Sequence, residues 1–158
     1  MSEQQQVHLG QRVPDFTLPT TSGENISLSQ FRGKKVVIYF YPKDSTPACT
    51  QQACDFRDST DYFAAKGAVV IGISADDLKS HQKFADKHAL PFPLLADTDK
   101  EVSRLFGVWQ LKKMYGREFE GIVRSTFLID ERGVLIKEWR KVKVGGHVNE
   151  VLQAISES

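Results

Sequence analysis

The feature that most constrains the fold is an apolar run followed closely by a helix start. Residues 35–41 read Lys-Val-Val-Ile-Tyr-Phe-Tyr, which is rich in β-branched and aromatic side chains. Such a run is typical of a strand buried on both faces by covering helices. Pro42 ends the run, and Thr46-Pro47 offers an N-cap residue before a proline at the first helical position. The segment predicts a strand, a short loop and a helix that extends to about Lys66.

The rest of the chain continues this alternation of strands and helices. Gly67 is expected to cap the C-terminal end of this helix. The turn-forming residues 21–25 lie between two short apolar segments and predict an N-terminal β-hairpin. Further strands are expected at residues 68–74, 92–96, 125–129 and 134–139, and further helices at residues 76–88, 100–106 and 147–155. This order predicts one α/β domain over residues 1–158, with a central mixed β-sheet flanked by helices. A thioredoxin-like fold fits the order, although periodicity alone does not separate it from other α/β folds.

The charge balance excludes several classes of partner. Lys and Arg number 21, Asp and Glu number 20, and the formal net charge is +1. We therefore expect no binding to nucleic acid or to an anionic membrane. The longest apolar runs fall well short of the roughly 20 residues that a membrane span needs. The polar start, Met-Ser-Glu-Gln-Gln-Gln, lacks the apolar core of a signal peptide, so we expect a cytoplasmic protein.

The chain has two cysteines, and both fall in the helix predicted after Pro47. Cys49 lies in the first turn, where unpaired backbone N–H groups and the positive helix end stabilise a thiolate. The alternative is an inert cysteine packed in the core. Cys54 follows five residues later, so ideal helix geometry puts the two Cα atoms about 8.7 Å apart. A disulfide needs less than about 7 Å, so a bond between the two thiols would require the helix to unwind.

The cysteine spacing alone is weak evidence for function, because two unrelated helix cysteines would also satisfy it. It matches neither a CxxC redox motif nor a set of zinc ligands, and we expect no bound metal. His81 and His88 are interpreted as packed or half-exposed side chains because neither has a partner at ligand spacing. Trp109 and Tyr115 are expected either at a rim near the cysteines or in the core.

The pattern Pro-x-x-x-Thr-x-x-Cys at residues 42–49 resembles the active-site motif of the peroxiredoxins. With Cys54 added, it is similar to the bacterioferritin comigratory protein or PrxQ branch of that family. The likeness continues through residues 112–116, 121–130 and 139–147, and spans about residues 8–155. It implies a thioredoxin-like fold and a thiol peroxidase that uses no cofactor.

The resemblance also implies a role for each matched residue. Cys49 would attack the peroxide and become a sulfenic acid, and Cys54 would condense with it to form an intramolecular disulfide. Thr46 would place its hydroxyl beside the peroxide, Pro42 would shield the thiolate from water, and Arg124 would stabilise the thiolate and polarise the leaving oxygen. Thioredoxin or a similar thiol reductant would then reduce the disulfide by exchange, and we expect the chain to be a monomer.

One position departs from the family pattern, in which a glutamate usually precedes the resolving cysteine by two residues. Here that residue is Gln52, which keeps the hydrogen-bonding capacity and loses the charge. We hypothesise that Gln52 leaves the reaction intact. Two alternatives to a peroxidase remain: a redox sensor on the same fold, and a general disulfide reductase, which the missing CxxC argues against.

Overall fold

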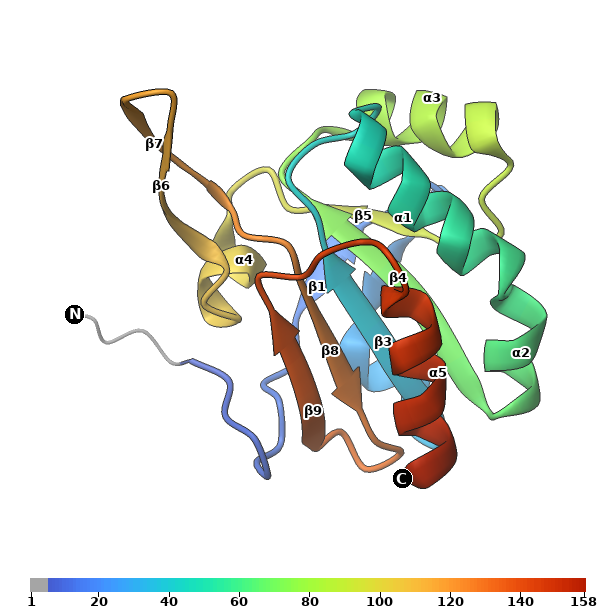
Figure 1. Cartoon of the computed structure of the whole chain (residues 1–158). Helices are drawn as coiled ribbons and strands as arrows, with labels where there is room; N and C mark the ends of the chain where they lie inside the picture. Colours follow the sequence, from blue (N-terminus) through green and yellow to red (C-terminus); the bar gives the residue numbers. More distant parts are fainter. Residues whose placement is uncertain (1–5) are drawn as a thin grey trace.

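A five-stranded mixed sheet forms the centre of the computed structural model, which describes residues 6–158 (Figure 1). The strand order is β5–β4–β3–β8–β9. The β3–β4 and β4–β5 pairs are parallel, whereas β3–β8 and β8–β9 are antiparallel. The strands are β3 (Lys35–Phe40), β4 (Ala68–Ser74), β5 (Leu94–Ala96), β8 (Ser125–Ile129) and β9 (Leu135–Arg140). The predicted α/β fold with a mixed central sheet is confirmed.

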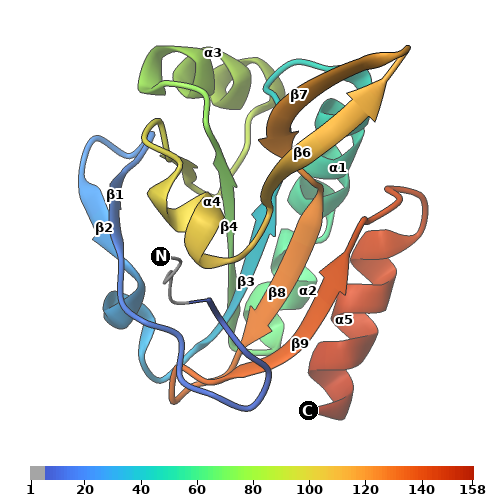
Figure 2. The ribbon, with the colours of Figure 1, turned by 90° about the vertical axis from the view of Figure 1, so that its left-hand side faces the viewer.

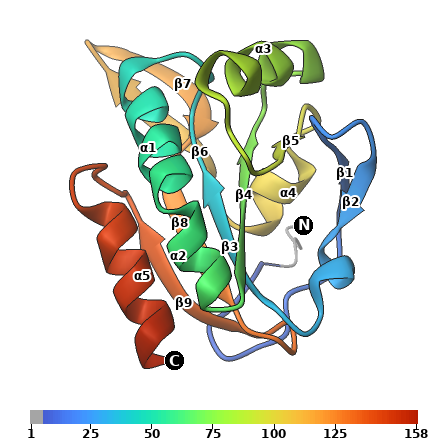
Figure 3. The same ribbon diagram turned by 90° about the vertical axis from the view of Figure 1, so that its right-hand side faces the viewer.

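Helices and loops cover both faces of this sheet, and the side chains of β3 alternate between the two cores. Val37 and Tyr39 pack beneath the helices of one face, whereas Ile38 and Phe40 pack against the other face. The first face carries α1 (Pro47–Asp58), α2 (Thr60–Ala65), α3 (Leu78–His88) and α5 (His147–Glu157) (Figure 3). The opposite face carries the N-terminal segment and α4 (Glu101–Leu105) (Figure 2). Burial on both sides explains why residues 35–41 lack polar alternation.

Two predicted hairpins are present. β1 (Thr17–Pro19) pairs antiparallel with β2 (Asn25–Ser27), and a short 3₁₀ helix, η1 (Leu28–Phe31), follows. β8 and β9 form the second hairpin, around the turn at residues 130–133. Within residues 6–158, no helix has both the length and the apolar character needed to cross a membrane.

The single helix predicted up to Lys66 is wrong, because the chain breaks at Ser59 between α1 and α2. The backbone N–H of Ser59 bonds to the Phe56 carbonyl at 3.1 Å, and the Thr60 hydroxyl donates to the same carbonyl at 3.1 Å. Hydroxyl side chains that bond to nearby backbone groups compete with the helix ladder in this way. Gly67, with φ +73°, follows the end of α2 as predicted.

A third hairpin was not predicted. β6 (Trp109–Met114) and β7 (Arg117–Ile122) pair antiparallel and project from the molecule (Figure 2). Tyr115 and Gly116 join them with φ values of +55° and +76°, as a tight two-residue hairpin turn requires. The Tyr115 side chain is 95% exposed at the hairpin tip, so it is not part of the core. Trp109 is partly buried and packs against the core on the α4 face.

Candidate active site

The strand register brings together two segments that are far apart in the sequence. Phe40, the last residue of β3, pairs with Ser125, the first residue of β8. Because the two strands run antiparallel, the loop after β3 and the residue before β8 lie at the same edge of the sheet. The loop leads into the first turn of α1, and the residue before β8 is Arg124. Cys49 and Arg124 therefore meet across 75 residues of chain.

Cys49 occupies the third position of α1 and is 1% exposed. Nη2 of Arg124 lies 3.4 Å from its Sγ atom, in the geometry of a donated hydrogen bond. The backbone N–H groups of the first helical turn add further positive potential at this place. The Arg124 cation and the start of the helix both place positive potential at this sulfur. The predicted proximity of Cys49 and Arg124 is present in the structure.

Gln52 fixes the orientation of the guanidinium. Nη1 of Arg124 donates to Oε1 of Gln52 at 2.6 Å, while Nη2 remains directed at Cys49. Gln52 is fully buried one helical turn after Cys49, so both side chains face the same side of α1. Its amide nitrogen has no hydrogen-bond partner among the residues that the structure describes. A neutral amide thus holds the arginine at the position where the family usually has glutamate.

Thr46 occupies the N-cap position of α1, as predicted, but its side chain forms no capping bond with the described part of the chain. Instead, the Thr46 hydroxyl donates to the carbonyl oxygen of Lys43 at 2.9 Å. A hydroxyl has one hydrogen, so the lone pairs of Thr46 remain available to accept a hydrogen bond from a ligand. Pro42 begins the same loop and is partly buried beside it.

Cys54 lies further along α1 and is partly buried. Both cysteines are free thiols, and the helix between them is continuous over Pro47–Asp58. Sγ of Cys54 lies 3.9 Å from Nδ1 of His88 at the end of α3. The structure is therefore that of the dithiol form, with the two cysteines separated by the intact helix, as the five-residue spacing predicts.

A second cation, Lys112 on β6, belongs to the surroundings of the site, although no role was predicted for it. Its Nζ donates to the Ile122 carbonyl at 2.9 Å and lies over the Phe119 ring. Burial and the positive charge of Arg124 lower the pKa of Lys112, while negative charge on Cys49 opposes this shift. In the sequence, the only sign that Lys112 lies near the site was its place in residues 112–116, a stretch that resembles the peroxiredoxins.

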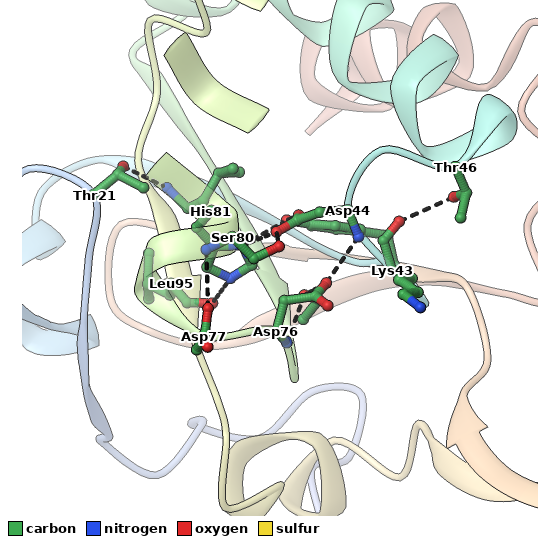
Figure 4. Close-up of polar contacts among 12 residues, drawn as sticks. Thr21, Lys43, Asp44, Thr46, Asp76, Asp77, Ser80, His81 and Leu95 are labelled. Atoms are coloured by element: carbon green, nitrogen blue, oxygen red, sulfur yellow. Dashed lines mark hydrogen bonds and ion pairs between the residues drawn. The ribbon is translucent and has the colours of Figure 1, made fainter. Parts of the chain in front are cut away.

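A largely buried polar cluster of Asp44, Asp76 and His81 includes the loop that carries Thr46 (Figure 4). Oxygen atoms of Asp44 and Asp76 and a ring nitrogen of His81 lie within 4.8 Å of one another. These atoms already form hydrogen bonds with each other and with neighbouring hydroxyl and backbone groups. The arrangement favours the interpretation of His81 as a packed side chain over that of a metal ligand.

Comparison with known proteins agrees with this geometry. The AhpC/TSA family profile matches residues 9–138. The chain is 54% identical to peroxiredoxin Bcp of Bacillus subtilis, over 96% of both chains, and 52% identical to a putative Bcp peroxiredoxin of Coxiella burnetii, over 92% of this chain and 97% of the relative. Peroxiredoxin Q of Xanthomonas campestris superposes with a TM-score of 0.86 at 43% identity over 90% of each chain. The chain therefore belongs to the AhpC/TSA family, as a peroxidase of its Bcp/PrxQ peroxiredoxin branch.

Proposed function

We propose that Cys49 is the nucleophile of this peroxidase and that Cys54 resolves its oxidised product as an intramolecular disulfide. The observation that carries the proposal is the Arg124 guanidinium, which is held by Gln52 and directed at Cys49 Sγ from 3.4 Å. Among the described residues, the two cysteines share one helix and differ in their surroundings. Cys49 lies in the first turn of α1 and receives the hydrogen bond from Arg124, whereas Cys54 lies further along the helix and contacts Nδ1 of His88 at 3.9 Å.

In the first step, the Cys49 thiolate attacks one peroxide oxygen and the O–O bond breaks. The O–H proton of the peroxide passes to the other oxygen, which leaves as water or as an alcohol, and the sulfenate that remains on Cys49 takes up a proton from water to become the sulfenic acid. Arg124 stabilises the negative charge that develops on the leaving oxygen. Thr46 accepts a hydrogen bond from the O–H of the peroxide, since its own hydrogen is donated to Lys43. Pro42 helps to exclude water from the thiolate.

In the second step, the Cys54 sulfur attacks the sulfenic sulfur of Cys49. The S–S bond forms, and the hydroxyl leaves as water with the proton of the Cys54 thiol. The continuous helix separates the two sulfurs, so α1 must unwind before they can bond. The break at Ser59 limits the segment that has to move, because α2 is a separate helix.

We further propose that the substrates are hydrogen peroxide and organic hydroperoxides and that thioredoxin or a similar dithiol reduces the disulfide. A structural study of the bacterioferritin comigratory protein of Xanthomonas campestris, which is 42% identical to this chain over 90% of each, concerned its alkyl peroxide reduction activity. The thiols supply both electrons, so the cycle needs no metal or organic cofactor. We also propose that the protein acts as a monomer in the cytoplasm.

The test is hydrogen peroxide consumption coupled to thioredoxin, thioredoxin reductase and NADPH. Cys49→Ser should abolish turnover, and Cys54→Ser should react once with peroxide and then stall as a sulfenic acid. Normal turnover by Cys49→Ser would remove Cys49 from the nucleophile role, and normal thioredoxin-dependent turnover by Cys54→Ser would remove Cys54 from the resolving role. A redox sensor would form the same disulfide without sustained turnover, so this assay also separates that alternative.

A further inference from the structure

The carboxylate of Asp44 is the centre of a buried hydrogen-bond network that the proposed reaction does not use. It accepts hydrogen bonds from Tyr41 Oη at 2.6 Å, from Ser80 Oγ at 2.8 Å and from His81 Nδ1 at 2.7 Å (Figure 4). The other ring nitrogen of His81 lies 3.0 Å from the Leu95 carbonyl. Both nitrogens of His81 therefore face oxygen atoms, so the ring is held between Asp44 and β5.

The backbone of Asp44 is anchored as firmly as its side chain. Its N–H donates to Oδ2 of Asp76 at 2.8 Å, and the Ser74 hydroxyl donates to the same oxygen at 2.7 Å. Ser74 is the last residue of β4, and Leu95 lies in β5. Two neighbouring sheet strands and α3 thus hold the loop that connects β3 to α1.

The anchored N–H belongs to the same peptide unit as the carbonyl group to which Thr46 is bonded. The peptide unit between Lys43 and Asp44 is planar, so its N–H and C=O groups cannot reorient independently. Asp76 binds the N–H of this unit, and the Thr46 hydroxyl donates to its carbonyl oxygen at 2.9 Å. The orientation of Thr46 is therefore tied to the position of the Asp76 carboxylate.

The residue between Asp44 and Thr46 shows that the loop shape is imposed by its surroundings. Ser45 has φ +66°, a left-handed conformation that costs free energy for a residue other than glycine. Such a conformation persists where neighbouring contacts determine it. Burial raises the pKa of Asp44, but the hydrogen bonds from His81, Tyr41 and Ser80 outweigh it and hold the pKa below its ordinary value. Asp44 is thus an ionised acceptor at neutral pH.

We propose that Asp44, Asp76 and His81 form a loop clamp whose function is to position Thr46 for the hydroperoxide. This inference rests on the proposed roles of Cys49 and Thr46. With the clamp closed, the hydrogen of Thr46 is committed to Lys43, and its oxygen accepts the O–H of the substrate beside Cys49. With the clamp open, the peptide unit rotates and Thr46 loses this fixed orientation. The clamp residues are positioning residues, because they act on the substrate through Thr46.

The test compares two reactions of Cys49 in a Cys54→Ser background. The first is oxidation by hydrogen peroxide, trapped at Cys49 with dimedone and followed by mass spectrometry. The second is alkylation by iodoacetamide, which needs an accessible thiolate but no partner for a peroxide O–H. Asp76→Ala removes the anchor of the Asp44 N–H, and Asp44→Asn removes the charge at the centre of the clamp. Each should slow oxidation by about tenfold or more while alkylation changes by less than about threefold.

Two further variants calibrate the result. Thr46→Val should show the same selective loss, because it removes the acceptor that the clamp positions. Asp97→Asn is the matched control, since Asp97 is buried and also accepts three hydrogen bonds, from the Val102 N–H and from the N–H and hydroxyl of Ser103. It is expected to lower stability and to leave the ratio of the two rates unchanged.

The outcomes separate the clamp from the proposed function. If dimedone does not label Cys49 in the parent protein, the nucleophile assignment fails before any clamp variant is made. If Thr46→Val is selective but both clamp variants keep the parent ratio, the clamp is overturned and the proposed function stands. Equal losses in oxidation and alkylation would also overturn the clamp, since they indicate general loss of structure. Asp76 is only partly buried, so Asp76→Ala provides the readout if Asp44→Asn fails to fold.

Discussion

Arg124 donates a hydrogen bond from Nη1 to the side-chain oxygen of Gln52 at 2.6 Å. The second nitrogen of the same guanidinium lies 3.4 Å from the Cys49 sulfur. The planar fork of the guanidinium makes the two contacts interdependent, because fixing one nitrogen also fixes the other. Gln52 therefore acts on the thiol through the arginine, and for this it needs an acceptor oxygen and no charge.

Gln52→Glu should change the rate of Cys49 oxidation by hydrogen peroxide by less than about tenfold, because a carboxylate oxygen can replace the amide oxygen as acceptor. We expect the change to be a decrease, since the added negative charge competes with the thiolate for Arg124. Gln52→Leu removes the acceptor at similar volume and should slow oxidation by more than Gln52→Glu does. Rapid-mixing kinetics in the Cys54→Ser background measures both. A change of several orders of magnitude in Gln52→Glu would contradict the view that the charge at this position is dispensable.

Formation of the Cys49–Cys54 disulfide should increase amide hydrogen exchange over residues 47–55, because the first turns of α1 must unwind to bring the sulfurs together. Hydrogen exchange of the reduced and oxidised protein, read by mass spectrometry, measures the effect. The helix α5 serves as an internal reference, and Cys54→Ser treated with the same peroxide should keep its protection. Unchanged exchange in a protein with a verified disulfide would rule out the unwinding step.

The stability of the fold should decrease as the pH falls below about 6.5, the ordinary pKa of histidine. Burial lowers the pKa of His147 in the folded protein, although Glu150 opposes the shift. The unfolded chain therefore takes up a proton at a pH where folded His147 is still neutral, which favours unfolding as the pH falls towards the folded pKa. Urea unfolding at pH 7.5 and pH 5.5 measures the loss. His147→Gln should be less stable than the parent protein at pH 7.5, but it should lose less stability than the parent between pH 7.5 and pH 5.5. An equal loss in both proteins would refute the view that His147 causes the pH dependence.

Gly72→Ala should destabilise the protein by about 1–3 kcal/mol, because overpacking of a close-packed core forces neighbouring side chains to move. An added Cβ would lie 2.8 Å from Tyr39 Cζ and 2.9 Å from Leu94 Cδ2. The Tyr39 ring is stacked on Phe56 of α1 at 4.6 Å between centroids, so it has little room to yield. Urea unfolding measures the cost. Gly145→Ala is the control, since its Cβ would meet no atom within 4 Å, and a similar loss in both variants would disprove the packing argument.

The path from β3 to α1 could be predicted because its signals are local. The apolar run, the following proline and the N-cap residue all lie within a dozen residues and need no knowledge of tertiary contacts. The proximity of Arg124 to Cys49 came only from the family resemblance. Its physical cause is the register of Phe40 with Ser125, which no local pattern specifies.

The features that were missed are those in which local pattern is weak. Apolar and polar residues alternate in β6 only over residues 109–112, which is too short a stretch to predict a strand in a hairpin that is mostly exposed. The Tyr115-Gly116 turn was the other usable signal. Asp44 looked like an ordinary loop residue because three of its partners, Asp76, Ser80 and His81, lie more than 30 residues away in the sequence. Hydrogen bonds between elements that are distant in the sequence leave no periodic trace, so only the structure shows them.

The break in the helical layer at Ser59 also bears on the reduction potential of the proposed disulfide. Unwinding of α1 lowers the stability of the oxidised state alone. The disulfide is therefore a stronger oxidant, by about 30 mV for each 1.4 kcal/mol of stability lost. Because α2 is a separate helix, we expect this contribution to come from α1 alone. The length of one short helix would thus help to set how readily a dithiol donor returns the enzyme to its active form.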